Sequence, residues 1–104
     1  MRRFRIFYTL TARADLLSIG DRIREARGNA SADRFMAHVI ATAEALQTMP
    51  RRHRVRRKLG SGIRATGFRK YMIFYRVEVD TVSIVRVLYG ARRITARLLR
   101  ADAP

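Results

Sequence analysis

Hydrophobic residues follow two different periods along this chain. Over residues 3–9 they alternate with polar residues, which predicts a strand with Phe4, Ile6 and Tyr8 on one side. Over residues 12–27 they recur every three or four positions, the spacing of one helix face, with Leu17 and Ala26 widening that face. The helical spacing returns over residues 32–46. The first half of the chain is therefore expected to be a strand followed by two helices.

Both helices have recognisable signals at their ends. Thr11 and Ser31 are suitable N-caps, because a short hydroxyl side chain accepts a hydrogen bond from the first helical turn. Gly28 and Asn29 tolerate the left-handed conformation that ends many helices, and Pro50 ends the second helix. The link between the two helices is short, so we expect an antiparallel helical hairpin.

The second half of the chain is richer in strand-forming residues. β-branched and aromatic side chains dominate residues 71–77 and 82–89, and the polar pair at 80–81 interrupts them, which predicts a β-hairpin. A brief strand is expected over residues 62–66. One or two helical turns are expected over residues 94–100. No repeat or low-complexity tract interrupts this order.

The order β-α-α-β-β-β predicts one α+β domain spanning residues 1–104. Each helix has a single apolar stripe, whereas the strands are apolar on both faces. We therefore expect the helical hairpin to pack on one face of a small, mainly antiparallel sheet. The register of the last hairpin stays open. A three-residue link places Arg76 and Arg86 on one face, whereas a two-residue link places them on opposite faces.

Charge is the outlying property of the composition. The chain has 23 Lys and Arg against 8 Asp and Glu, a formal net charge of +15, and all but two of the cations are arginine. Arginine forms bidentate bonds with phosphates and carboxylates, so an acidic partner is expected, either nucleic acid or an acidic protein. Cysteine is absent, and no apolar run is long enough to suggest a signal peptide or a membrane span. A cytoplasmic location is therefore expected.

Few residues suit catalysis. His38 and His53 are far apart in the sequence, and no cluster of carboxylates or histidines has the spacing of a metal site. We therefore predict no metal, no cofactor and no catalytic residue. Residues 51–60 form a strongly basic connector without an acid. It is either a patch that binds phosphate or acidic groups or a solvated loop, and the sequence leaves both interpretations open.

Four segments, in this order, resemble the ParE-type toxins of bacterial toxin–antitoxin pairs. Residues 11–16 (TARADL) are similar to the family's LTPRAxxDL segment, and residues 32–50 to its second helix. Residues 59–64 (LGSGIR) resemble its LxxGLR segment. Residues 71–93 resemble its last hairpin, an IFYRV strand followed by IVRVLHGAR. The resemblance therefore extends over most of the chain.

The resemblance implies one scaffold with two possible activities. ParE-type members poison DNA gyrase, whereas RelE-type members cleave messenger RNA on the ribosome. The ribonuclease branch usually has an arginine where this chain has Met72, although Arg92 matches its later arginine. Tyr89 and Arg93 replace a histidine and an aspartate common in ParE-type toxins. We expect a non-enzymatic gyrase poison; an RelE-type ribonuclease and a basic nucleic-acid-binding module are the alternatives.

We expect two binding surfaces, the first implied by the resemblance and the second by the exposed arginines that follow the last strand. An acidic antitoxin is expected to form a hetero-oligomer with this chain by placing a helix or strand between the helical hairpin and the sheet. The residues expected to contact it are Leu17, Met36, Ile40, Arg56 and Arg57. The segment after the last strand is expected to be anchored by the sheet, to keep its arginines exposed and mobile, and to contact the toxin's target. Its expected contact residues are Tyr89, Arg92, Arg93, Arg97 and Arg100.

Overall fold

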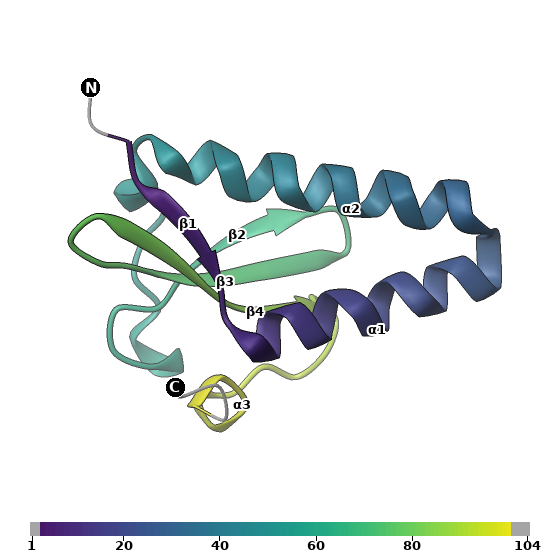
Figure 1. Cartoon of the computed structure of the whole chain (residues 1–104). Coiled ribbons are helices and arrows are strands. Elements are labelled where there is room, and N and C mark those ends of the chain that lie inside the picture. Colours follow the sequence, from purple (N-terminus) through teal and green to yellow (C-terminus); the bar gives the residue numbers. More distant parts are fainter. Residues whose placement is uncertain (1–2, 101–104) are drawn as a thin grey trace.

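The computed structural model describes residues 3–100 of the chain. Its element order is the predicted one, with a short helix after the last strand (Figure 1). In chain order the elements are β1 (Arg5–Tyr8), α1 (Leu10–Arg27), α2 (Asn29–Glu44), three 3-10 turns (Ala45–Gln47, Pro50–Arg52 and Arg57–Leu59), β2 (Arg64–Phe68), β3 (Tyr71–Val77), β4 (Thr81–Tyr89) and α3 (Ala96–Arg100).

Helix α1 begins earlier than predicted. Thr9 has extended backbone angles and its Oγ1 accepts a hydrogen bond from the Ala12 N–H at 3.1 Å, so Thr9 is the N-cap and the prediction of Thr11 is wrong. The prediction of Ser31 is also wrong, because Ser31 lies inside α2. Gly28 joins the two helices with a φ of 92°, which glycine adopts without the steric penalty of a Cβ atom.

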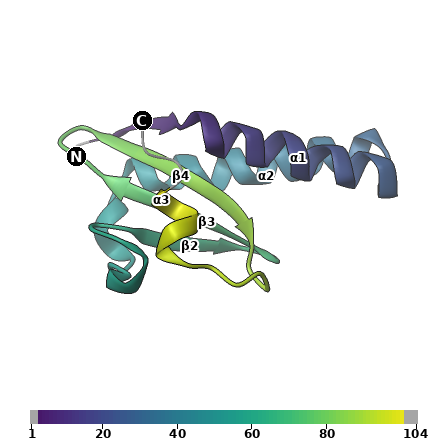
Figure 2. The same cartoon turned by 90° about the horizontal axis from the view of Figure 1, so that it is seen from below.

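Helices α1 and α2 cover one face of the sheet as an antiparallel pair, and their joined end projects beyond the strands (Figures 1 and 2). Leu16 and Ile19 of α1 and Phe35 and Val39 of α2 are buried in one cluster with residues of β3 and β4. The predicted helical hairpin on one face is therefore confirmed. Leu17 and Ala26 are exposed, so the apolar face of α1 is narrower than predicted.

The sheet has the order β1-β4-β3-β2 and is mixed. Strand β1 runs parallel to β4, whereas the β4–β3 and β3–β2 pairs are antiparallel. Helix α3 and the connector cover the second face of the sheet (Figure 2). Phe74, Val85, Leu88 and Leu99 are buried there in a second cluster, which explains why β3 and β4 are apolar on both faces. No helix within residues 3–100 is both long and apolar enough to cross a membrane.

The register of the β3–β4 hairpin combines a two-residue link with a bulge. The strands are joined through residues 79–80, and the pairing then shifts by one residue between Phe74 and Tyr75. A two-residue link alone would place Arg76 and Arg86 on opposite faces. The shift pairs Arg86 with Phe74, which returns it to the face that carries Arg76. The bulge therefore places Arg76 and Arg86 on the same face, although the two-residue link alone would place them on opposite faces.

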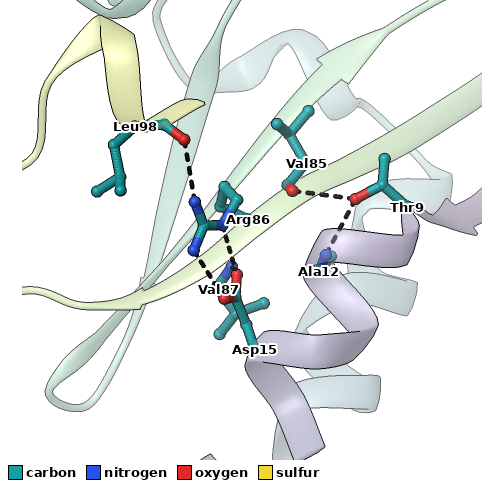
Figure 3. Close-up of polar contacts among 7 residues, drawn as sticks. All are labelled: Thr9, Ala12, Asp15, Val85, Arg86, Val87 and Leu98. Carbon is teal, nitrogen blue, oxygen red and sulfur yellow. Dashed lines mark hydrogen bonds and ion pairs between the residues drawn. The ribbon is translucent and has the colours of Figure 1, made fainter. Parts of the chain in front are cut away.

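One buried ion pair joins α1, β4 and α3 (Figure 3). Arg86 donates from Nε and Nη2 to the two carboxylate oxygens of Asp15, each at 2.8 Å, and its Nη1 donates to the Leu98 carbonyl at 2.9 Å. The Val87 N–H also donates to Asp15, at 3.0 Å. The Arg86 and Asp15 side chains are only 10% and 12% exposed. Both charges are thus withdrawn from water and matched by specific partners.

We predict that Asp15→Ala lowers the free energy of unfolding by about 3 kcal/mol, because Arg86 would remain buried without its counterion. The measurement is urea-induced unfolding. Asp21→Ala is the matched control, since it removes an exposed pair with Arg24 on the same helix. The control variant should lower the free energy of unfolding by less than about 1 kcal/mol. Equal losses in the two variants would contradict the structural role of Asp15.

Candidate functional site

The connector is held in place by side chains of the sheet. Tyr75 is buried and its hydroxyl donates to the Pro50 carbonyl at 2.7 Å, just before the connector begins. Arg64 donates from Nη1 to the carbonyls of Arg51 and His53, at 3.2 and 2.6 Å. These bonds fix the main chain of the connector, so its own cationic side chains project from a defined backbone.

A hollow of about 890 Å³ opens beside the connector on the second face of the sheet. We call it the basic groove. Four cations line it, and Met72 lies in the same lining. No acid is among the lining residues, and none of the four cations has an ion pair within residues 3–100. The groove therefore carries an uncompensated positive charge that suits an anionic partner. The four cations are Arg54, Arg56, Arg57 and Lys58.

A second basic surface lies where β4 ends. The half-exposed ring of Tyr89 meets the Tyr71 ring edge to face, with 6.0 Å between the ring centres. The Gly90 N–H donates to the Lys70 carbonyl at 2.6 Å, which ties the chain after β4 to the turn between β2 and β3. A side chain at position 90 would come within 3.0 Å of that carbonyl oxygen. Glycine thus allows this close approach, and the main chain next to Tyr89 is fixed to the turn between β2 and β3.

A smaller hollow of about 320 Å³ lies between α1 and the end of β4. We call it the edge hollow. Arg22 of α1 and Arg92 both line it, and neither has an ion pair among the described residues. Sequence reasoning missed Arg22, although it follows Asp15 by seven residues and so lies on the same side of α1. The remaining lining residues are Asp15, Ser18, Ile19, Val87, Leu88 and Tyr89.

The residues predicted to contact the target follow one another along the surface after β4. Tyr89 and Arg92 meet at the edge hollow, while Arg93 and Arg97 are exposed. The segment is not a free tail, however. Buried Leu99 packs in the second cluster, and the carbonyl of the preceding residue accepts from Arg86, so this segment is also attached to the sheet near its end. The predicted contact through the Arg100 side chain lies outside the described residues.

The residues predicted to contact an antitoxin do not form one surface. Leu17 and Ile40 are 67% and 42% exposed on the helical hairpin, at similar distances from its turn. Met36 is partly buried and packs against the first cluster. Arg56 and Arg57 line the basic groove, which opens on the opposite face of the sheet. The apolar and the basic members of the set thus lie on different sides of the protein.

Both histidines lie against aromatic rings. The His38 ring meets Phe68 with 5.5 Å between the ring centres, and His53 meets Tyr75 with 6.4 Å between them. Among residues 3–100, no three His, Cys, Asp or Glu side chains gather in a way that could hold a metal ion. The two hollows described above are instead suited to binding anionic groups.

Comparison with known proteins gives a consistent result. Residues 6–94 match the family model for the ParE toxin of the type II toxin–antitoxin system parDE. The chain resembles a structure of the chromosomal ParDE system of P. aeruginosa, with a TM-score of 0.74, 20% identity, and coverage of 84% of this chain and 96% of that one. It also resembles the RelBE2 toxin–antitoxin complex of Mycobacterium tuberculosis, with a TM-score of 0.61, 29% identity, and coverage of 88% and 97%. No curated protein matches.

Tyr75 provides a test of how the connector is held. Burial raises the pKa of Tyr75 from 10.0 to about 12, against the opposing effect of nearby guanidinium groups. The folded protein then keeps a proton that the unfolded chain releases, so stability is lost as the pH rises from 10 to 12. Tyr75→Phe should reduce this loss of stability at high pH. At neutral pH it should lower the free energy of unfolding by about 1 kcal/mol, because the bond to the Pro50 carbonyl is lost, and unfolding measured from neutral pH to pH 12 checks both effects. Tyr89→Phe, at an exposed ring, is the matched control; an unchanged pH dependence in Tyr75→Phe would contradict the assignment.

Proposed function

The chain belongs to the ParE toxin family of type II toxin–antitoxin systems, and on this premise we propose that it inhibits growth by poisoning DNA gyrase. The observation that carries the proposal is the surface after β4, where Tyr89 and exposed arginines are held on a rigid sheet. A poison of a protein–DNA complex requires a cationic contact surface of this kind, because phosphate contacts position a protein on DNA. It requires no catalytic group of its own.

The positions of Met72 and Arg92 favour this proposal over a ribonuclease. Met72 lines the basic groove at the position where the resemblance would place an arginine of the ribonuclease branch. Arg92 lines the edge hollow and is not among the residues that line the groove. A ribonuclease must both orient the attacking 2′-hydroxyl and neutralise the charge that develops on the phosphate. One arginine outside the groove does not supply both functions.

Two observations favour other functions. The four cations of the basic groove and the likeness to the RelBE2 complex, at 29% identity, support an RelE-type ribonuclease as the second candidate. The net charge of +15 supports a module that binds nucleic acid without toxicity. Both candidates use the charge of the chain.

We further propose that an acidic antitoxin neutralises this chain. Both similar structures are toxin–antitoxin systems, and a domain with a charge of +15 associates readily with a complementary anion. Leu17 and Ile40 lie on the helical hairpin, whereas Arg56 and Arg57 lie in the basic groove on the other face. An antitoxin that uses both sets must extend from one face to the other, as a segment that folds on binding can do.

The antitoxin proposal predicts the effect of Leu17→Asp combined with Ile40→Asp. The change places two carboxylates on an apolar contact and should raise the dissociation constant for the antitoxin by about tenfold or more. Folding should be unaffected, because both side chains are exposed. Binding is measured by calorimetry with the protein encoded beside this one, with Val79→Asp in the β3–β4 link as the exposed control. Unchanged affinity in the double variant would exclude the helical hairpin as the contact.

The target proposal predicts the effect of Arg92→Ala combined with Arg93→Ala. Growth arrest should be lost, while thermal stability and antitoxin binding stay unchanged, because both arginines are exposed and neither has an ion pair in the described chain. The measurement is growth after induction, in gyrase-sensitive and gyrase-resistant cells, with trapped cleavage complexes as the direct readout. Arg27→Ala with Arg34→Ala, near the turn of the helical hairpin, is the control and should remain toxic.

Two outcomes would contradict the target proposal. Full toxicity of the Arg92→Ala, Arg93→Ala variant would exclude the surface after β4. Growth arrest in gyrase-resistant cells, with cut messages in primer extension and rapid loss of translation, would instead establish the ribonuclease alternative.

A further inference from the structure

The edge of β4 that faces α1 is only partly paired. Strand β1 pairs with β4 from Thr81 to Ile84, so the rest of β4 has no strand on this side. The start of α1 satisfies two of the exposed groups. Thr9 donates from its hydroxyl to the Val85 carbonyl at 3.0 Å, and the Val87 N–H donates to Asp15 (Figure 3). Because exposed backbone groups at a sheet edge bind other chains, the remaining groups on this edge matter.

The hydrogen-bond pattern identifies those remaining groups. The Gly90 N–H donates to the Lys70 carbonyl, just beyond the paired residues Tyr71 and Tyr89, so this bond continues the ladder on the side of β4 that faces β3. Hydrogen-bonded pairs alternate along antiparallel strands, so Val87 and Tyr89 direct their N–H and C=O groups away from β3. The bond from Val87 to Asp15 agrees with this direction. The open edge therefore presents the backbone groups of Val87 and Tyr89.

Half of these groups already have partners. The Val87 N–H is bonded to Asp15, and the Tyr89 carbonyl accepts from the Arg92 N–H at 3.0 Å. The alternation directs the Val87 carbonyl and the Tyr89 N–H away from β3 as well, and within residues 3–100 neither group takes part in a hydrogen bond outside the sheet ladder. An antiparallel strand would need the occupied groups. A parallel strand needs the other two groups. One of its residues donates its N–H to the Val87 carbonyl, and the carbonyl of that same residue accepts from the Tyr89 N–H.

The charges around this edge favour an acidic occupant. These two groups belong to residues that line the edge hollow, where Arg22 and Arg92 also lie. Asp15 is the only acid in the lining, and Arg86 and Val87 occupy both of its oxygens. An incoming carboxylate therefore meets two cations that no neighbouring acid neutralises.

We propose that the edge hollow binds an extended acidic peptide segment of a partner protein, parallel to β4. One peptide residue bridges the Val87 carbonyl and the Tyr89 N–H, and acidic side chains on either side of it contact Arg22 and Arg92. A single peptide residue supplies the donor and the acceptor at this spacing, which a phosphodiester backbone does not. The inference deepens the proposed function by naming the chemistry of a partner segment. It rests on the proposed function only for the identity of the protein that supplies this segment.

The test uses the full chain labelled with ¹⁵N and a blocked tripeptide, acetyl-Glu-Val-Glu-methylamide. Saturation should shift the Tyr89 amide resonance and slow exchange of that amide by about tenfold or more, because its N–H gains an acceptor. N-methylation of the central valine should weaken binding about tenfold. N-methylation of the following residue, whose N–H points away from β4, should leave binding within about twofold.

Charge-reversal variants separate this site from general attraction to a basic protein. Arg22→Glu should weaken binding about tenfold, whereas Arg27→Glu, on the same helix but outside the lining, should change it by less than about twofold. Three results would each overturn the proposal: equal losses in the two variants, no effect of central N-methylation, or an equal Tyr89 shift with a thymidine trinucleotide. The test needs neither gyrase nor antitoxin, so its failure leaves the growth-arrest prediction standing, and the reverse also holds.

Discussion

The buried pair of Asp15 and Arg86 is the interaction on which the rest of this structure depends. Two charges withdrawn from water are tolerated only if hydrogen bonds satisfy them fully, and here every polar group of the pair has a partner on α1, β4 or α3. The β4 bulge brings Arg86 into reach, and Asp15 closes part of the β4 edge where β1 ends. Helix position, strand register and the attachment of α3 are thus coupled through one contact.

The excess of arginine has two separate physical uses. Arg64 and Arg86 donate to main-chain carbonyls of the connector and of α3, and Arg76 donates to the Ser61 carbonyl just after the connector. The cations of the basic groove and of the edge hollow have no acidic neighbours paired with them in the described chain. The net charge is therefore larger than the charge available for binding, because some of the arginines stabilise the fold. What remains lines two hollows, one on the second face of the sheet and one between α1 and the end of β4.

A family scaffold fixes the helical hairpin and the sheet, while the surface chemistry of each member decides what it binds. In this chain Met72 lies in the basic groove at the position where the resemblance implies an arginine of the ribonuclease branch, and Tyr89 and Arg92 line the edge hollow together. These replacements leave the sheet intact because they lie at its surface and margins, and they direct the proposed function toward binding.

The sequence by itself determined the order of elements, the helical hairpin on one face and the family, because hydrophobic period and local motifs depend on near neighbours. Tertiary structure decided the rest. Thr9 is the N-cap in place of Thr11 because it also bonds to β4, far away in the sequence. The bulge at Arg86 sets a register that the link length alone would reverse. Tertiary structure also separates Leu17 from the basic groove. Which side chains share a surface depends on contacts between segments that are distant in the sequence, and local periodicity carries no information about those contacts.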